Sequence, residues 1–545
     1  MTIVIPRDLR SFAFTELTLV DLNDVDIDRL LPQLWELIVK QGRQSNPLKD
    51  ADDYKHYLDA LAADERMVGF EDEQGKRVLD GWLRSSVVRI GAKGRTKAGT
   101  QMAYIQPLTI ASYRAGLPKV RRNRNADTLI YRLLIDEMRL RGWEPPQKPL
   151  RQALQKAVGA GVDISVDGQW QPRYNGHEEI DVNALLSLYF LEEFTMGGVR
   201  KDPGFAPVDS AVPSATRGLA NDLLDYLTTY GGQLPPAAFV DRFAALISLR
   251  LFQLPLRIAR ASRHVITTGQ KSSDMQDEDV PNPLALYCDF TRIRGSASDE
   301  LARQCVQRDM EITRGFLSDR LLLRSLREAM GSLKQKGEEI KGLPMPDRLI
   351  AMIAEKENLR VGAYADYQMD LIEKETHADA SGTAEDLAFI SEVKNSEALA
   401  VDQLAALLVE ALSGVGLKNQ VKWFWNTGGI QKPYGLLMGS VKSRRSWRYA
   451  PSDDLLNAIL LVCFTRPQDQ RPKTRMPIKD LLDILDKRFG ILIDRPPADF
   501  DSADNRAAAA HNFEAFKRRL RLLGCFDGLS DDFSAQYVSN PVETA

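Results

Sequence analysis

Apolar residues in this chain recur three and four positions apart, and this helical spacing constrains the fold more than any other feature. The pattern is clearest in residues 30–38, 219–227, 239–251 and 401–412, where leucines and other apolar side chains would line one helix face. The alternation typical of β-strands is rare. The sequence therefore predicts a mainly α protein.

One β-hairpin is expected in the N-terminal part. Val87 to Ile90 and Met102 to Ile105 are short apolar runs on either side of a glycine-rich turn. Such a pair predicts two antiparallel strands joined by a long loop. The N-terminal part is therefore expected to be α+β, with a long β-hairpin.

At 545 residues the chain is too long for one core, so we expect it to be multidomain. Stretches rich in Pro, Gly, Ser or Asp predict linkers at 200–215, 269–283, 374–386 and 494–510. The expected parts are an N-terminal α+β domain (1–200) with the basic hairpin, a helical segment (216–268), a helical domain (284–375), a helical and aromatic basic segment (386–439) and a winged-helix-like domain (440–545).

Other features bear on the compartment and on cofactors. The N-terminus lacks the uninterrupted apolar run of a signal peptide, and no eighteen apolar residues follow one another. The four cysteines form no CxxC pair, which argues against a disulfide framework or a zinc module. We expect a cytoplasmic protein without a membrane span, a cofactor or a metal.

The net charge of −3 conceals an uneven distribution of charge. Residues 84–125, 242–273 and 411–452 contain lysines and arginines but no aspartate or glutamate. Acid-free blocks of this length predict separate positive surfaces.

The tip of the predicted hairpin alternates cations with glycines. Lys93, Arg95 and Lys97 lie there, and glycine allows a backbone to approach a ligand while cations neutralise phosphate. The loop does not match the Walker A pattern. A mobile, solvated hairpin is the alternative. The following cations favour nucleic-acid binding; they are Lys119, Arg121, Arg122 and Arg124.

Residues 421–449 interleave aromatic and cationic side chains. Aromatic rings can stack on unpaired bases while cations follow the phosphate backbone. Buried tryptophan usually belongs to a core, and we expect this of Trp423 and Trp425. No carboxylate lies nearby in the sequence to pair with the arginines, so we interpret them as nucleic-acid contacts; they are Arg444, Arg445 and Arg448.

The C-terminal segment predicts three helices and a strand. Helices are expected from Asp453 to Phe464, from Pro477 to Phe489 and over residues 512–524, with a strand at 536–540. This is the order of elements in a winged helix, whose third helix enters the major groove of DNA. Such domains also serve as protein adaptors, and that alternative stays open.

The third of these helices is expected to have one basic face. Lys517, Arg518 and Arg521 are spaced to share a helix surface and to contact nucleic acid. Leucines on the other side are expected to form the core of the domain; they are Leu520, Leu522 and Leu523.

The C-terminal residues also carry a resemblance. The runs PIKDLLDILDKRFGILIDRPP and NFEAFKRRLRLLGCFDGLSDDFSAQYVSNP resemble the C-terminal region of non-enzymatic accessory components of bacterial methylation-associated anti-phage defence systems. The likeness covers about the last 90 residues. It implies partners encoded in the same operon, such as helicases, nucleases or methyltransferases, and it identifies no active residue.

One enzymatic alternative deserves its own test. Glu392 and Lys394 form an ExK pair, as in magnesium-dependent PD-(D/E)xK nucleases, with Asp386 upstream. The surrounding sequence is more typical of a capped helix. The histidines are scattered without metal-ligand spacing, so no catalytic residue is assigned.

The sequence thus favours a nucleic-acid-binding accessory or scaffold subunit, with DNA preferred over RNA, that binds mainly through phosphate contacts. The alternatives are the nuclease that would use Glu392 and Lys394, and a purely protein-binding assembly subunit.

Overall fold

The fold was analysed in a computed structural model of the chain. The residues that this structure describes are 3–11, 13–39, 41–42, 55, 58–59, 62–63, 69–85, 87–89, 105–107, 124–158, 162–163, 173–174, 206–276, 280–466, 471–527 and 536–542.

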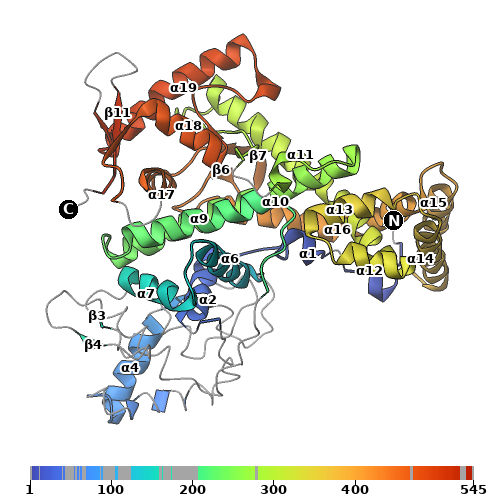
Figure 1. The fold of residues 1–545 in the computed structure, drawn as a ribbon, viewed down its shortest axis with the longest axis horizontal. Coiled ribbons are helices and arrows are strands. Elements are labelled where there is room, and N and C mark those ends of the chain that lie inside the picture. Colours follow the sequence, from blue (N-terminus) through green and yellow to red (C-terminus); the bar gives the residue numbers. More distant parts are fainter. Residues whose placement is uncertain are drawn as a thin grey trace.

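Helices dominate these residues, which confirms the mainly α prediction (Figure 1). In the first half of the chain they are α1 (Thr15–Thr18), α2 (Ile27–Val39), α4 (Glu73–Ser85), α6 (Ala126–Leu140), α7 (Gln147–Val158), α9 (Pro213–Tyr230) and α10 (Pro236–Thr268). In the second half they are α11 (Ala297–Ala329), α12 (Gln335–Lys341), α13 (Met345–Ala354), α14 (Leu359–Ala378), α15 (Ala384–Lys394), α16 (Ala400–Thr427), α17 (Asp453–Phe464), α18 (Ile478–Phe489) and α19 (Ala503–Leu522).

The strands are short, and the predicted N-terminal hairpin has its two antiparallel strands. In it β1 (Val87–Arg89) pairs with β2 (Ile105–Pro107), with Val87 opposite Pro107. The hairpin tip lies outside the described residues. The other pairs are β3 (Val162–Asp163) with β4 (Arg173–Tyr174), β5 (Leu286–Tyr287) in parallel with β9 (Ile491–Leu492), and β6 (Leu437–Ser440) with β7 (Ser443–Tyr449).

Helix α10 is the central element of the fold. It contacts α9, α11, α16 and α17, and Figure 1 shows it crossing the middle of the molecule. Its apolar residues are buried along most of its length, from Phe239 to Val265. A helix covered on several sides must be apolar around much of its circumference, and the sequence of α10 meets this demand.

Pro255 interrupts the hydrogen bonding of α10. Proline has no N–H, so the carbonyl oxygen of Leu251, four residues earlier, loses its helical donor. The indole Nε1 of Trp423 on α16 donates to this oxygen at 3.0 Å. Trp423 is buried, as predicted, whereas Trp425 is half-buried against the core. The tryptophan therefore both fills the core and satisfies a carbonyl that the proline leaves open.

Helix α16 is long and apolar enough to cross a bilayer by length and composition alone. The core helix of a soluble protein passes the same test. In this fold α16 packs against α11 and α14, and Leu404, Leu407 and Leu408 are buried there.

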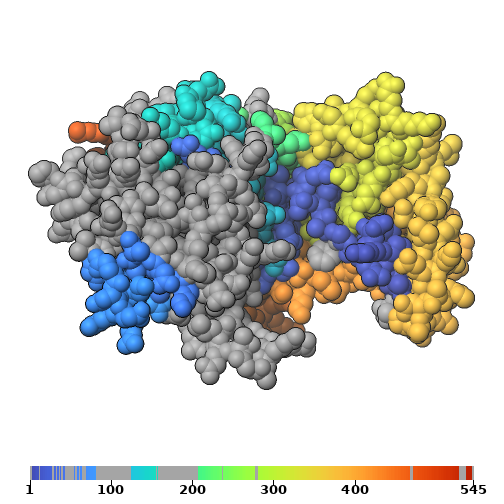
Figure 2. All heavy atoms as spheres, turned by 90° about the horizontal axis from the view of Figure 1, so that it is seen from below, coloured from blue at the N-terminus to red at the C-terminus, as the bar shows by residue number. Residues whose placement is uncertain are grey.

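The N-terminal residues lie against helices far along the chain. Figure 2 shows them (dark blue) beside the helices drawn in yellow and orange. The backbone N–H of Val4 donates to Thr376 Oγ1 at 3.1 Å, and Arg324 donates to the carbonyl oxygen of Asp8 at 3.0 Å. The segment therefore belongs to the core of the fold.

Segments predicted as linkers contribute to the same buried cluster. Asp274 and Met275 are buried in the short 3₁₀ helix η3 (Ser273–Met275), and Ala211 and Val212 are buried before α9. One continuous cluster of buried apolar residues extends from Ile3 to Val538. The division into five parts stays a prediction.

The C-terminal region runs in the order α17, β8 (Arg475–Pro477), α18, β9, the short 3₁₀ helix η5 (Ala498–Phe500), α19, β10 (Phe526–Asp527) and β11 (Tyr537–Ser539). The last strand confirms the one predicted at 536–540, and β11 lies between β10 and β8 in an antiparallel sheet. Helix α19 begins nine residues earlier than predicted. The Ser502 side chain accepts from Asn505 N at 3.2 Å and caps it, and the alanine-rich run that follows favours helix.

We expect Trp423→Phe to lower the free energy of unfolding by about 1–3 kcal/mol, because it leaves the Leu251 carbonyl buried without a donor. Trp425→Phe is the matched control and should change stability less. Chemical denaturation of both variants measures this. Equal effects would contradict a role for the indole hydrogen bond.

Candidate functional site

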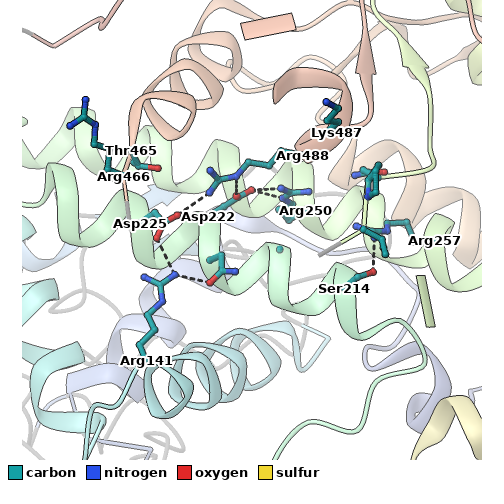
Figure 3. Close-up of a pocket in the computed structure, with 15 residues that line it drawn as sticks. Arg141, Ser214, Asp222, Asp225, Arg250, Arg257, Thr465, Arg466, Lys487 and Arg488 are labelled. Atoms are coloured by element: carbon teal, nitrogen blue, oxygen red, sulfur yellow. Dashed lines mark hydrogen bonds and ion pairs between the residues drawn. The ribbon is translucent and has the colours of Figure 1, made fainter. Parts of the chain in front are cut away.

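A cleft of about 550 Å³ opens between α9, α10 and α18 (Figure 3). Cations, carboxylates and small polar side chains line most of it. The lining residues are Arg141, Ser214, Gly218, Asn221, Asp222, Asp225, Arg250, Arg257, Val280, Pro281, Asn282, Thr465, Arg466, Lys487 and Arg488.

Asp222 is the centre of the ion pairs in this cleft. Its carboxylate is fully buried on α9, and each oxygen contacts an arginine from another helix. Arg250 Nε on α10 donates to Oδ2 at 2.5 Å, and Arg488 Nε on α18 donates to Oδ1 at 2.6 Å. Figure 3 shows both arginines directed at this one carboxylate. These two ion pairs therefore join α9, α10 and α18.

A second carboxylate extends the network towards α6. Arg488 Nη2 contacts Asp225 at 3.0 Å, and Arg141 Nη2 contacts the other oxygen of Asp225 at 3.0 Å. Arg141 also donates to Asn221 Oδ1 at 2.6 Å and to Glu137 at 3.0 Å. The end of α6 is thereby tied to α9.

Arg257 forms a separate pair at the far end of the cleft. Its Nε and Nη2 donate to the two oxygens of Asp274 at 2.9 and 2.6 Å, and Nη2 also donates to Ser214 Oγ at 2.8 Å. This bidentate contact ties the residues that follow α10 to the start of α9.

The two arginines on Asp222 respond differently to burial. Burial lowers the pKa of Arg250, and the nearby Asp222 only partly offsets this effect. Burial also opposes the charge of Arg488, but Asp222 and Asp225 together raise its pKa. In both of these buried ion pairs, removing one partner would leave the other charge buried without an opposite charge.

The rim of the cleft carries two exposed cations, Arg466 and Lys487. Arg466 is exposed, and it forms no ion pair with any residue that the structure describes. Lys487 Nζ lies 3.8 Å from Asp483, at the limit of an ion pair, and its side chain is 65% exposed. Within the described parts of the chain, these two side chains therefore lie outside the interior network of ion pairs.

The expectation of a positive surface is wrong for the acid-free block at 242–273. Arg250 and Arg257 are buried on Asp222 and Asp274, while Arg260 and Arg263 contact Asp309 and Asp319. The carboxylates come from segments outside the block or at its very edge. Absence of acids from a block of sequence does not mean absence of acids around it in space.

Of the cations predicted around the N-terminal hairpin, the structure describes only Arg124. It contacts Asp21 at 3.2 Å and also Asp24, so its guanidinium has protein partners. The other six lie outside the described residues; they are Lys93, Arg95, Lys97, Lys119, Arg121 and Arg122.

The three arginines of β7 fall into two groups. Arg448 Nε lies 2.8 Å from the buried Asp299 on α11, a carboxylate that its sequence neighbourhood did not reveal. Arg444 and Arg445 are exposed, and neither forms an ion pair with a residue that the structure describes.

The predicted basic face of α19 is also divided. Lys517 is buried, lies over the Phe513 ring and pairs with Glu514 at 2.5 Å, so it does not share the exposed surface of Arg518 and Arg521. The core expected from three leucines is correct for Leu520 and wrong for Leu522, which is 76% exposed. Leu523 is partly buried.

The ExK pair lies on a helix. Thr383 and Asp386 form a capping box that begins α15, as the capped-helix interpretation expected. Lys394 contacts Asp370 at 2.7 Å and Glu373 at 2.6 Å, while Glu392 is exposed. Across the part of the chain that the structure describes, no three His, Cys, Asp or Glu residues are grouped to hold a metal.

Sequence reasoning missed the cleft, although a signal was present. Asp222 lies three residues after Leu219 and one before Leu223, on the buried face of α9. Arg250 occupies the same kind of position on α10, three residues after Ile247. A charged residue on an apolar helix face requires a partner, so these positions were detectable as halves of pairs.

The fold and the cleft thus define a mainly helical protein in which a network of buried ion pairs joins α9, α10 and α18. Residues 7–542 match the family described as Methylation-associated defense system protein MAD7, and the chain belongs to that family. The match extends the resemblance from the last 90 residues to almost the whole chain. No curated protein matches the chain.

We expect Asp222→Ala to lower the free energy of unfolding by about 3–5 kcal/mol, since the buried Arg250 would lose the carboxylate with which it is paired. Asp483→Ala, which removes an exposed carboxylate from α18, is the control and should change it by less than about 0.5 kcal/mol. Thermal or denaturant unfolding distinguishes the two. A small loss for Asp222→Ala would mean that the network is not structural.

Proposed function

We propose that this chain is a DNA-binding accessory subunit of its defence system, which acts with subunits encoded in the same operon. Binding is mainly electrostatic, through phosphate contacts, and weakly sequence-specific. The observation that carries the proposal is the β6–β7 hairpin, whose tip presents exposed cations on a rigidly held base; they are Lys442, Arg444 and Arg445.

The base of this hairpin is fixed in the core. Trp447 is buried and stacks on Phe424, with 6.3 Å between ring centroids. Tyr449 donates its hydroxyl to Asp309 Oδ2 at 2.8 Å. A cationic tip on an anchored base loses little conformational freedom when it meets a phosphate, which favours a binding role over a solvated loop.

The C-terminal region supports the proposal through the order of its elements. Apart from β9, which pairs with β5 outside this region, the order is α17, β8, α18, α19, β10 and β11, with β11 in the middle of the sheet, and this order is compatible with a winged helix. In that interpretation α19 is the helix that meets the major groove, and Arg518 and Arg521 are its phosphate contacts.

A second candidate is a protein-docking role for α19. Leu522 is 76% exposed beside Arg521, and the exposed face of the helix also includes Glu514 and several alanines. A protein partner that covered this face would remove the Leu522 side chain from water, which is favourable. The two candidates predict different effects of the same substitutions.

We expect Arg444→Ala with Arg445→Ala to weaken duplex binding and to reduce the slope of log K against log salt concentration by about two units, one for each lost phosphate contact. Binding by the unsubstituted chain should fall about tenfold or more between 50 and 200 mM salt. Fluorescence anisotropy measures both. Arg360→Ala with Lys374→Ala, which removes two exposed cations from α14, is the matched control. An unchanged slope in the hairpin variant would contradict the proposal.

We expect Arg518→Glu with Arg521→Glu to abolish duplex binding by α19, because repulsion replaces attraction at the phosphates. Lys517 is left in place because it is buried. Leu522→Ser should leave DNA affinity unchanged. If instead Leu522→Ser prevents copurification with the operon-encoded subunits while the charge reversal leaves DNA affinity intact, α19 is a protein-docking helix.

A further inference from the structure

The helices α14 and α15 and the residues at their ends carry a concentrated negative charge. Residues 357–397 contain ten aspartates and glutamates but three lysines and arginines, which gives a net charge of −7. The elements around this pair do not offset it. Helices α11, α12, α13 and α16 each contain equal numbers of acidic and basic residues, as do the N-terminal residues 3–18, and Lys334 adds a single cation. The excess therefore belongs to α14 and α15 themselves.

Much of this charge is at the surface. The three cations of the segment are Arg360, Lys374 and Lys394. Lys394 contacts Asp370 at 2.7 Å and Glu373 at 2.6 Å, so one cation already serves two of the acids. Asp366 on α14 and Glu392 on α15 are exposed, and neither forms an ion pair with a residue that the structure describes. Seven of the ten acidic residues are exposed, so negative charge faces water on both helices.

An apolar row lies on the solvent side of α14. Leu359, Ala363 and Tyr367 are four residues apart, so they share one face of the helix, and all three are exposed. Leu359 is 90% exposed and Tyr367 is 60% exposed. These side chains do not contribute to the core, whereas a partner that covered the row would remove its apolar area from water, which is favourable.

The charge of this surface distinguishes among possible occupants. A nucleic acid would be repelled by it. A second copy of the chain, related by a two-fold axis, would bring the same acidic surface against itself. A protein with a basic face and apolar side chains is complementary in both charge and polarity.

We propose that α14 and α15 form the docking site for a basic subunit of the same defence system. The apolar row on α14 is the centre of the contact, and the carboxylates around it pair with lysines and arginines of that subunit. This inference rests on the part of the proposed function in which the chain acts with other subunits of its system, and it does not depend on DNA binding.

The docking site is well separated from the proposed DNA-binding surface. Figure 1 shows α14 and α15 at one end of the molecule, away from α19 and from the β6–β7 hairpin. A subunit docked on α14 and α15 therefore leaves Arg444, Arg445 and Arg518 accessible to phosphates. In this arrangement the chain holds its partner at one end and the duplex at the other.

Co-expression of the tagged full chain with each of the other proteins of the system, one at a time, tests the proposal. The amount of the second protein that copurifies is measured at about 0.1 and 0.5 M salt. We expect one of these proteins to copurify, and we expect less of it at the higher salt, because screening weakens a contact between opposite charges.

Two double substitutions locate the contact. Leu359→Ser with Tyr367→Ser removes the apolar row and changes no charge. Asp366→Lys with Glu392→Lys reverses one exposed, unpaired carboxylate on each helix. Each should lower the captured amount at least about tenfold, because interface contacts at the centre and between opposite charges are lost. The positions are exposed, so the melting temperature of both variants should stay close to that of the unsubstituted chain.

Matched controls come from other helices. Leu140→Ser removes an apolar side chain that is 68% exposed on α6. Glu300→Lys with Glu311→Lys reverses two exposed carboxylates on α11. Both control variants should capture the partner as the unsubstituted chain does.

Several results would overturn the proposal. They are the absence of any copurifying subunit, capture that survives both α14–α15 variants, and capture that Leu522→Ser abolishes while those variants retain it, which would place the docking site on α19. Mass photometry provides a further test, since a dimer of this chain that the α14–α15 variants disrupt would assign the surface to a second copy. Duplex affinity should be unchanged in Leu359→Ser with Tyr367→Ser, so a failure of the DNA-binding role is recognised separately from a failure of docking.

Discussion

The buried carboxylate of Asp222 determines how α9, α10 and α18 meet. Arg250 and Arg488 each use their Nε to contact one of its oxygens, so both arginines have fixed directions and the three helices have little freedom to slide. An apolar contact of similar volume can stabilise as much, but it specifies position less strictly. The ion pairs on Asp222 thus hold the three helices that line the cleft.

The cations of this chain therefore belong to two populations. One is internal and neutralised by carboxylates on other helices, as Arg448 is by Asp299 and Arg257 by Asp274. The other is exposed, and it includes the tip of the β6–β7 hairpin and the cleft rim. This division explains how a chain of net charge −3 holds long acid-free blocks without presenting each of them as a positive surface.

Local patterns were predictable and distant pairings were not. The spacing of leucines located α2, α9, α10 and α16, and the strand at 537–539 was expected, because each depends on neighbours within a few positions. Lys517 was misplaced because spacing alone does not tell which side of α19 faces α11. The cleft escaped because its parts, such as Asp222 and Arg488, are 266 residues apart. The one local signal was a charged residue, Asp222, on the apolar face of a predicted helix, because a buried charge requires an oppositely charged partner.

That separation has a consequence for the order of assembly. During synthesis, α9 and α10 leave the ribosome long before α18. More than two hundred further residues are therefore made before Arg488 can contact Asp222. During that interval Asp222 can pair with Arg250 but lacks its contact with Arg488. Its final packing is a late event, completed only when the C-terminal helices emerge, and a chain interrupted before residue 488 would be left with an open and charged interior for quality control to recognise.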